Sequence, residues 1–183
     1  MNICVYGASS KTIDKSYIED GEHLGKIMAE RGHSLVFGGG ANGLMGAVAR
    51  GVYSIGGKIK GVVPKFFNVD GILFDNCDEL IRPDTMRERK QIMEDSSDGF
   101  IITPGGIGTF EEFFEILTLK HLKQIDTPIF ILNTDGFFDS MFAFIDDMIS
   151  KNAVSETVPA LYEVIENPDD ERLIKCLKEI INK

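Results

Sequence analysis

The feature that most constrains the fold is a glycine-rich turn between an apolar run and an amphipathic segment, within residues 99–121. Residues 99–103 are apolar and β-branched, which predicts a buried strand. From Thr109 onward, phenylalanine and leucine recur at helical spacing. The turn between them consists of Pro104, Gly105, Gly106, Ile107 and Gly108. Such a turn brings free backbone N–H groups and the positive end of a helix dipole to one point, which predicts a phosphate site. Thr109 can cap the helix or donate its hydroxyl to that phosphate.

Three acidic residues follow the turn: Glu111, Glu112 and Glu115. A carboxylate in the first turn of a helix is stabilised by the helix dipole, so a structural role explains any one of them. A site for phosphate alone would not gather carboxylates. Their presence indicates that the ligand has a second group, which a carboxylate contacts.

Composition limits the function classes. The 183 residues are 43% hydrophobic and 26% charged, typical of one soluble domain, which we place at residues 1–183. The net charge of −10 argues against nucleic acid or an anionic membrane as partner. The three cysteines, Cys4, Cys77 and Cys176, are widely spaced, and the three histidines lack ligand spacing. We therefore expect reduced thiols, no metal site and a cytoplasmic protein without export signal or membrane span.

Apolar runs and amphipathic segments alternate along the whole chain, which predicts a doubly wound, Rossmann-like α/β fold with a mostly parallel sheet. The expected strands are 3–6, 33–37, 58–64, 80–83, 99–103, 128–133 and 164–166. Expected helices include one ending at Gly32, one capped by Asp84, one at 137–149 and one from Asn167 and Pro168 through Ile181. Glycine turns after three strands should meet at one carboxyl edge of the sheet.

A second glycine turn satisfies the G-x-G-x-x-G pattern at Gly38, Gly40 and Gly43. A dinucleotide site would need an acidic residue at the end of the next strand, and residues 58–64 contain none. The pattern therefore argues against NAD and for a backbone surface that contacts a flat or phosphorylated ligand. Residues 64–78, past the end of that strand, are predicted to form a loop that flanks the pocket. Within this loop, Lys65 either meets a substrate anion or is an exposed lysine with no task.

Basic residues begin the helix after Thr85: Arg87, Arg89 and Lys90. Cations in the first turns oppose the helix dipole. This cost favours an anionic partner, either a nucleotide phosphate or Glu112, over a solvated face.

Three segments together resemble the Lonely Guy (LOG) family, long described as possible lysine decarboxylases. Residues 104–112 match its PGGxGTxxE signature, residues 38–46 match GGGxxGLMG, and residues 86–90 resemble MHxRK. The resemblance runs from residues 7–10 to residues 133–136. Arg87 stands where many members have histidine, so the family does not assign it a role. Residues 119–121 replace a usual Trp-Ala-Gln, and substrate preference differs here if that helix end helps to hold the base or the dimer partner.

The resemblance implies a hydrolase that cleaves a cytokinin riboside monophosphate or AMP into free base and ribose 5-phosphate, without cofactor. Glu112 would stabilise an oxocarbenium-like sugar, and Arg89 would hold phosphate or Glu112. The predicted substrate-binding residues are Ser9, Gly39, Gly40, Asn42, Met86, Lys90, Gly105, Gly106, Gly108, Thr109 and Glu111. Apolar residues on more than one side of the central helix also predict a homodimer: Phe110, Phe113, Phe114 and Ile116.

A nucleotide-binding sensor or carrier is the alternative, because a fold by itself implies no activity. The pairing of Glu112 with Arg89 favours an enzyme, since a phosphate binder gains nothing from a carboxylate. Decarboxylation is disfavoured, because the lysine that holds pyridoxal phosphate in such enzymes is missing from the central glycine motif.

Overall fold

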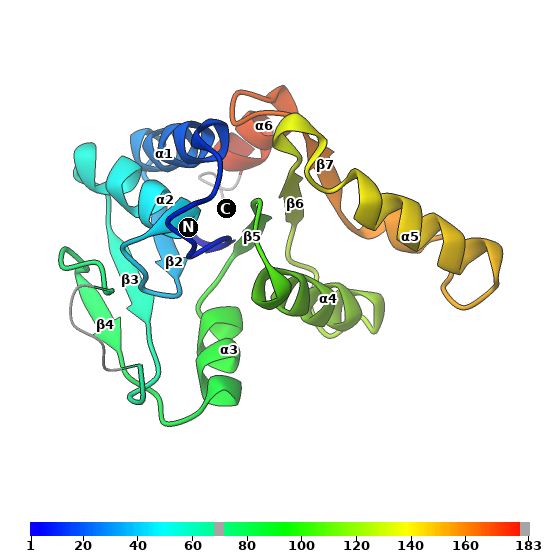
Figure 1. Cartoon of the computed structure of the whole chain (residues 1–183), viewed down its shortest axis with the longest axis horizontal. Helices are drawn as coiled ribbons and strands as arrows, with labels where there is room; N and C mark the ends of the chain where they lie inside the picture. The colour runs from blue at the N-terminus through cyan, green and yellow to red at the C-terminus, as the bar shows by residue number, and fades with distance from the viewer. Residues whose placement is uncertain (68–71, 180–183) are drawn as a thin grey trace.

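A computed structural model describes residues 1–67 and 72–179 of the chain (Figure 1). Its strands form one sheet in the order β4-β3-β2-β1-β5-β6-β7, and neighbouring strands pair parallel throughout. The strands are β1 (Asn2–Tyr6), β2 (Ser34–Phe37), β3 (Ile59–Val62), β4 (Glu79–Ile81), β5 (Gly99–Ile102), β6 (Ile129–Leu132) and β7 (Glu163–Ile165). The helices are α1 (Lys15–Glu30), α2 (Gly43–Ser54), α3 (Met86–Asp95), α4 (Ile107–His121), α5 (Asp139–Ser150) and α6 (Glu171–Glu179), with short 3₁₀ turns at Thr134–Gly136 and Val158–Leu161.

Helices cover both faces of the sheet, because successive strand residues point to opposite sides. In β1, Ile3 and Val5 join a core with α1, α2 and α6, whereas Cys4 and Tyr6 join a core with α3, α4 and α5. Figure 1 shows these two helical layers with the strands between them. The predicted doubly wound α/β fold is confirmed.

Strand positions agree with the prediction to within two residues, and two helix starts differ from it by two residues or more. Helix α4 begins at Ile107, two residues before Thr109, and α6 begins at Glu171, after the turn that follows Pro168. The predicted end of the last helix at Ile181 lies outside the described residues. None of the described helices is long and apolar enough to cross a bilayer.

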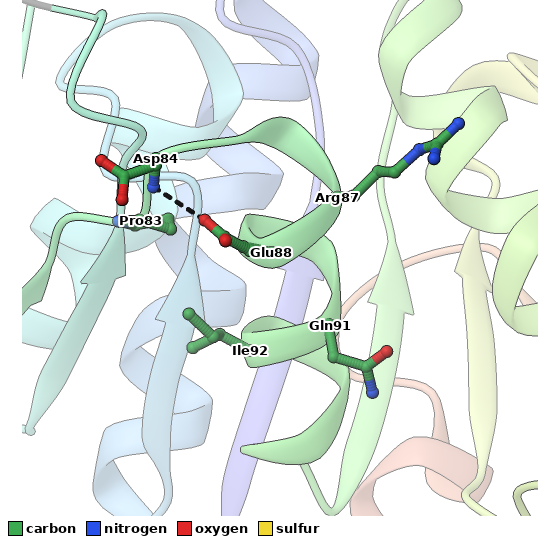
Figure 2. Close-up of a pocket in the computed structure, with 6 residues that line it drawn as sticks. All are labelled: Pro83, Asp84, Arg87, Glu88, Gln91 and Ile92. Atoms are coloured by element: carbon green, nitrogen blue, oxygen red, sulfur yellow. Dashed lines mark hydrogen bonds between the residues drawn. The ribbon is translucent and has the colours of Figure 1, made fainter.

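The cap of α3 corrects the prediction that named Asp84. Thr85 is the N-cap residue: its hydroxyl accepts from the Glu88 N–H, and the Glu88 carboxylate accepts from the backbone N–H groups of Thr85 and Asp84. Figure 2 shows Glu88 turned back toward Asp84. The Asp84 carboxylate instead lies 2.8 Å from the ammonium of Lys65, so Lys65 has a partner at the surface.

The order of the sheet places a crevice at the carboxyl ends of β1 and β5. From β1 the chain winds outward through β2, β3 and β4, and then returns to β5 on the other side, which is the topological switch point where α/β proteins bind ligands. The turns after these strands contact one another. The Ala8 N–H donates to the Pro104 carbonyl at 3.0 Å, and the Met45 N–H donates to the Ala8 carbonyl at 3.2 Å.

Candidate active site

A pocket of about 310 Å³ occupies this crevice. It is bounded by the turns after β1, β2, β3 and β5 and by the first turns of α3 and α4. The expectation that three glycine turns meet at one edge is confirmed. The pocket is lined by eight of the predicted site residues: Ser9, Gly40, Met86, Arg89, Gly106, Gly108, Thr109 and Glu112.

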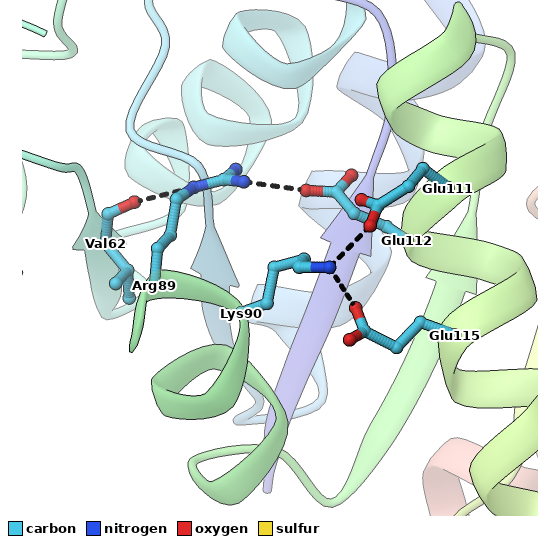
Figure 3. Close-up of polar contacts among 6 residues, drawn as sticks. All are labelled: Val62, Arg89, Lys90, Glu111, Glu112 and Glu115. Carbon is cyan, nitrogen blue, oxygen red and sulfur yellow. Dashed lines mark hydrogen bonds and ion pairs between the residues drawn. The ribbon is translucent and has the colours of Figure 1, made fainter. Parts of the chain in front are cut away.

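Arg89 and Glu112 form a buried ion pair in this pocket. The Arg89 Nη1 group donates to Glu112 Oε1 at 2.9 Å, and each residue is only 8% exposed. Arg89 Nε also donates to the Val62 carbonyl at 3.2 Å, which fixes the guanidinium from the β3 side (Figure 3). The pair identifies Glu112 as an anionic partner of Arg89, one of the two that the sequence predicted.

The turn after β2 makes room for this pair. A Cβ atom at Gly38 would collide with the Arg89 Nη2 group. Glycine at this position therefore has a steric cause: the guanidinium packs directly against the backbone. The G-x-G-x-x-G motif identifies Gly38, but no pattern in the sequence shows that Arg89 packs against it.

Burial controls the ionisation of Glu112. Desolvation raises the pKa of its carboxyl, and the positive charge and hydrogen bond of Arg89 oppose part of that rise. Below the pocket, burial also raises the pKa of the Tyr6 phenol well above its usual range, so Tyr6 is a neutral neighbour. Glu112 is thus a buried carboxyl group with the Arg89 guanidinium beside it.

The first turn of α4 forms another wall of the pocket. Gly106 is the N-cap residue, and Thr109 is buried with its side chain against Gly105. Because α4 begins at Ile107, the N–H groups of Ile107 and Gly108 belong to the first helical turn, which has no intrahelical acceptors for them. Apart from adjacent residues and the backbone of α4 itself, no atom of the described chain lies within 4 Å of a Cβ built at Gly106 or Gly108. Space for a ligand close to the backbone is therefore present on this side.

Five predicted site residues do not line the pocket. Gly39 has φ +75°, and its carbonyl accepts from the Phe74 N–H. Asn42 caps α2, and Gly105 packs against Thr109. Lys90 and Glu111 pair with each other beside the pocket, with Glu115 as a third member (Figure 3). Arg87 lines a separate hollow of about 450 Å³ along α3 (Figure 2).

The sequence interpretation missed an apolar wall opposite the glycine turn. It consists of Met45, Val63, Pro64, Phe67, Ile72 and Leu73. Val63 and Pro64 directly follow β3, and Met45 lies in the second glycine motif, so their position at the carboxyl edge was a usable signal. The loop that the sequence predicted beside the pocket contributes Phe67, Ile72 and Leu73 to this wall, although no pattern identified them as lining residues. Among the described residues, no three His, Cys, Asp or Glu side chains are placed to hold a metal ion.

Comparisons with known proteins identify relatives over almost the whole chain. The family described as possible lysine decarboxylase matches residues 45–174. The cytokinin riboside 5′-monophosphate phosphoribohydrolase of Mycobacterium tuberculosis is 40% identical, over 92% of this chain and 89% of that protein. The enzyme of the same name, LOG2, from Arabidopsis thaliana is 35% identical, over 99% of this chain and 84% of that protein. The solved structure of the molybdenum cofactor carrier protein from Chlamydomonas reinhardtii has the same fold, with a TM-score of 0.72 and 24% identity over 100% of this chain and 98% of that one. This chain therefore belongs to the Lonely Guy family, whose members carry the older description of possible lysine decarboxylases.

Proposed function

We propose that this protein is a phosphoribohydrolase, which cleaves the N-glycosidic bond of a purine or cytokinin nucleoside 5′-monophosphate. The products are the free base and ribose 5-phosphate. The observation that carries the proposal is the buried Arg89–Glu112 pair, in one pocket with the glycine-rich start of α4. Relatives with 35–40% identity and nearly full coverage bear the name of this activity.

The glycine turn supports binding of the 5′-phosphate. Gly106, Gly108 and Thr109 at the start of α4 line the pocket, and the helix dipole favours an anion there. Ser9 and Gly40 line the same space from the turns after β1 and β2, and Met86 does so from α3. The residues beside the pocket, Gly39, Asn42 and Gly105, act in this proposal by shaping these turns.

Glu112 supports the bond cleavage. As the bond between the anomeric carbon and the base nitrogen breaks, its electron pair leaves with the base, and positive charge develops on the ribose. A fixed carboxylate close to that charge lowers the barrier, since its field needs no reorganisation. A water oxygen then bonds to the anomeric carbon, and Glu112 orients that water. Of the two protons of this water, one remains on the new hydroxyl and the other balances the charge of the departing base. Arg89 holds the carboxylate in place through Oε1, which leaves Oε2 for the sugar or the water.

The test is incubation of the purified protein with AMP, a prenylated adenosine monophosphate and the matching unphosphorylated nucleosides, followed by chromatography for free base. We expect base release from the monophosphates and a much slower reaction of the nucleosides. Equal rates for AMP and adenosine would refute the role of the glycine turn, because phosphate binding would contribute nothing to the transition state. Binding of AMP without base release would favour the alternative, a nucleotide carrier or sensor.

We further propose a cytoplasmic homodimer. An apolar groove of about 500 Å³ between α4 and α5 is lined by Phe114, Leu117 and Met148, among others, and Phe144 at its side is 55% exposed. Phe113 and Ile116, which the prediction counted toward a dimer contact, are buried in the chain's own core. Light scattering at micromolar concentration should give twice the chain mass of 20.3 kDa, and a single-chain mass would contradict the dimer.

A further inference from the structure

Two sets of ion pairs join α3 to α4, and only one lies in the pocket. Arg89 and Lys90 are consecutive in α3 and point to consecutive acids of α4 (Figure 3). Arg89 reaches Glu112 in the pocket. The Lys90 ammonium lies 2.5 Å from Glu111 Oε1 and 2.7 Å from Glu115 Oε2, outside the residues that line the pocket.

We propose that Lys90 is a positioning residue, which holds the first turns of α4 against α3 and sets the position and the electrostatic surroundings of Glu112. In this proposal neither Lys90 nor Glu111 contacts substrate, contrary to the role that the sequence predicted for them. The inference rests on the proposed function, because it takes Glu112 as the catalytic carboxylate.

The first argument is geometric. Glu111 and Glu115 are one helical turn apart, so their carboxylates share a face of α4 and repel each other unless a cation lies between them. Lys90 occupies that place with a side chain only 13% exposed. Only Arg89 and Met93 are buried among the ten residues of α3. Apolar packing holds this short helix mainly through Met93 and the partly buried Ile92, so the Lys90 ion pairs add a direct link from α3 to α4 beside the Arg89–Glu112 contact.

The second argument concerns charge around Glu112. The groups that face it are Arg89 and Lys90 from α3, Glu111 from its own helix, and the neutral Cys4 and Tyr6 from β1. The Lys90 ammonium lowers the pKa of Glu112, and the Glu111 carboxylate raises it.

Loss of this ammonium would add to the negative charge near Glu112. Glu94 of α3 and Glu115 of α4 also face Lys90, and both would lose their neighbouring cation. The pKa of Glu112 would then rise, and less of it would be ionised at acid pH.

The experiment compares Lys90→Met with Lys90→Arg, which keeps the charge, and with Lys60→Met as matched control. Lys60 forms a partly buried ion pair with Glu79 at 3.0 Å between β3 and β4, away from α4. Base release from AMP is measured as kcat and KM from pH 5 to pH 9. We expect Lys90→Met to move the acid limb to higher pH, with about three- to tenfold more activity lost at acid than at alkaline pH. Lys90→Arg should recover the profile, and Lys60→Met should match wild type.

A second readout needs no turnover. Carboxyl ¹³C NMR titration follows Glu112 directly, with its signal assigned by its absence in Glu112→Gln. Its midpoint should rise in Lys90→Met. The Glu112 midpoint should fall in the double variant that combines Glu111→Gln with Glu115→Gln. This variant tests the same charges if Lys90→Met does not fold.

The outcomes separate this inference from the proposed function. A wild-type protein that releases no base would refute the function, and the titration alone would then decide the inference. An unmoved Glu112 midpoint in both variants would overturn the inference. A raised KM with an unshifted pH profile in Lys90→Met would also overturn the inference, and would indicate that Lys90 contacts the substrate.

Discussion

Replacement of Glu112 by Gln separates charge from shape at the centre of the pocket. The amide oxygen of Gln can still accept the hydrogen bond that Arg89 donates at 2.9 Å, and the side-chain volume is nearly unchanged. Glu112→Ala is less informative, because it leaves a buried guanidinium without its partner, which costs about 3–5 kcal/mol of stability. We therefore expect Glu112→Gln to fold and to bind AMP as wild type does.

The expected loss follows from the electrostatics of the site. A carboxylate about 4 Å from a developing unit charge contributes about 4 kcal/mol at an effective dielectric constant of about 20. Arg89 already contacts one of the two oxygens, so part of the carboxylate's field is neutralised. Removal of one preorganised stabilising group typically costs a hundredfold to a thousandfold in kcat. We expect Glu112→Gln to fall in that range.

The assay is single-turnover base release, with AMP affinity measured by calorimetry on the same samples. Glu111→Gln is the control: its side chain is 53% exposed and pairs with Lys90, so its turnover should fall less than about tenfold. A larger loss of turnover in Glu111→Gln than in Glu112→Gln would show that Glu111, and not Glu112, supplies the catalytic charge. Wild-type turnover in Glu112→Gln would refute the electrostatic role, and the carrier alternative would then be the better explanation.

Three further predictions follow from the same contacts. Gly38→Ala should displace the Arg89 guanidinium and lower kcat about tenfold or more in a folded protein, as measured by turnover and circular dichroism. Gly106→Ala should leave the melting temperature within a few degrees of wild type, because its Cβ faces open space, yet weaken AMP binding in calorimetry. Burial, with a contribution from Glu115, raises the pKa of Glu94 from 4.5 to about 7, so the unfolded chain binds fewer protons and stability falls as pH rises through that window. Glu94→Gln should therefore gain about 1 kcal/mol at pH 8 and nothing at pH 4 in urea unfolding, after allowance for its partial exposure.

The sequence predicts an anionic partner for Arg89, either a nucleotide phosphate or Glu112, because both residues are locally anomalous. A cation in the first turn of α3 opposes the helix dipole, and a carboxylate beside a phosphate-binding turn opposes the ligand. Local cost of this kind indicates a partner elsewhere in the chain. Periodicity likewise places the strands, because apolar runs of four or five residues between glycine turns permit little else.

Other features depend on neighbours that no local pattern contains. The choice of Thr85 over Asp84 as the cap of α3 was readable, since Thr85 and Glu88 have the spacing of a capping box. The place of Lys90 between Glu111 and Glu115 requires the relative position of α3 and α4, which tertiary packing sets.

Helix α4 can contact both the phosphate and the sugar of the proposed substrate, because the sign of the charge that it stabilises changes along its length. At Ile107 the first N–H groups of α4 favour an anion, and five residues later Glu112 favours a cation. Five residues correspond to a rise of about 7.5 Å, the scale of a ribose 5-phosphate from its phosphate to its anomeric carbon. A carrier needs only the first of these two positions. In the proposed reaction the second position stabilises the positive charge that develops on the sugar, and it is there that the fold buries a carboxylate and fixes it with Arg89.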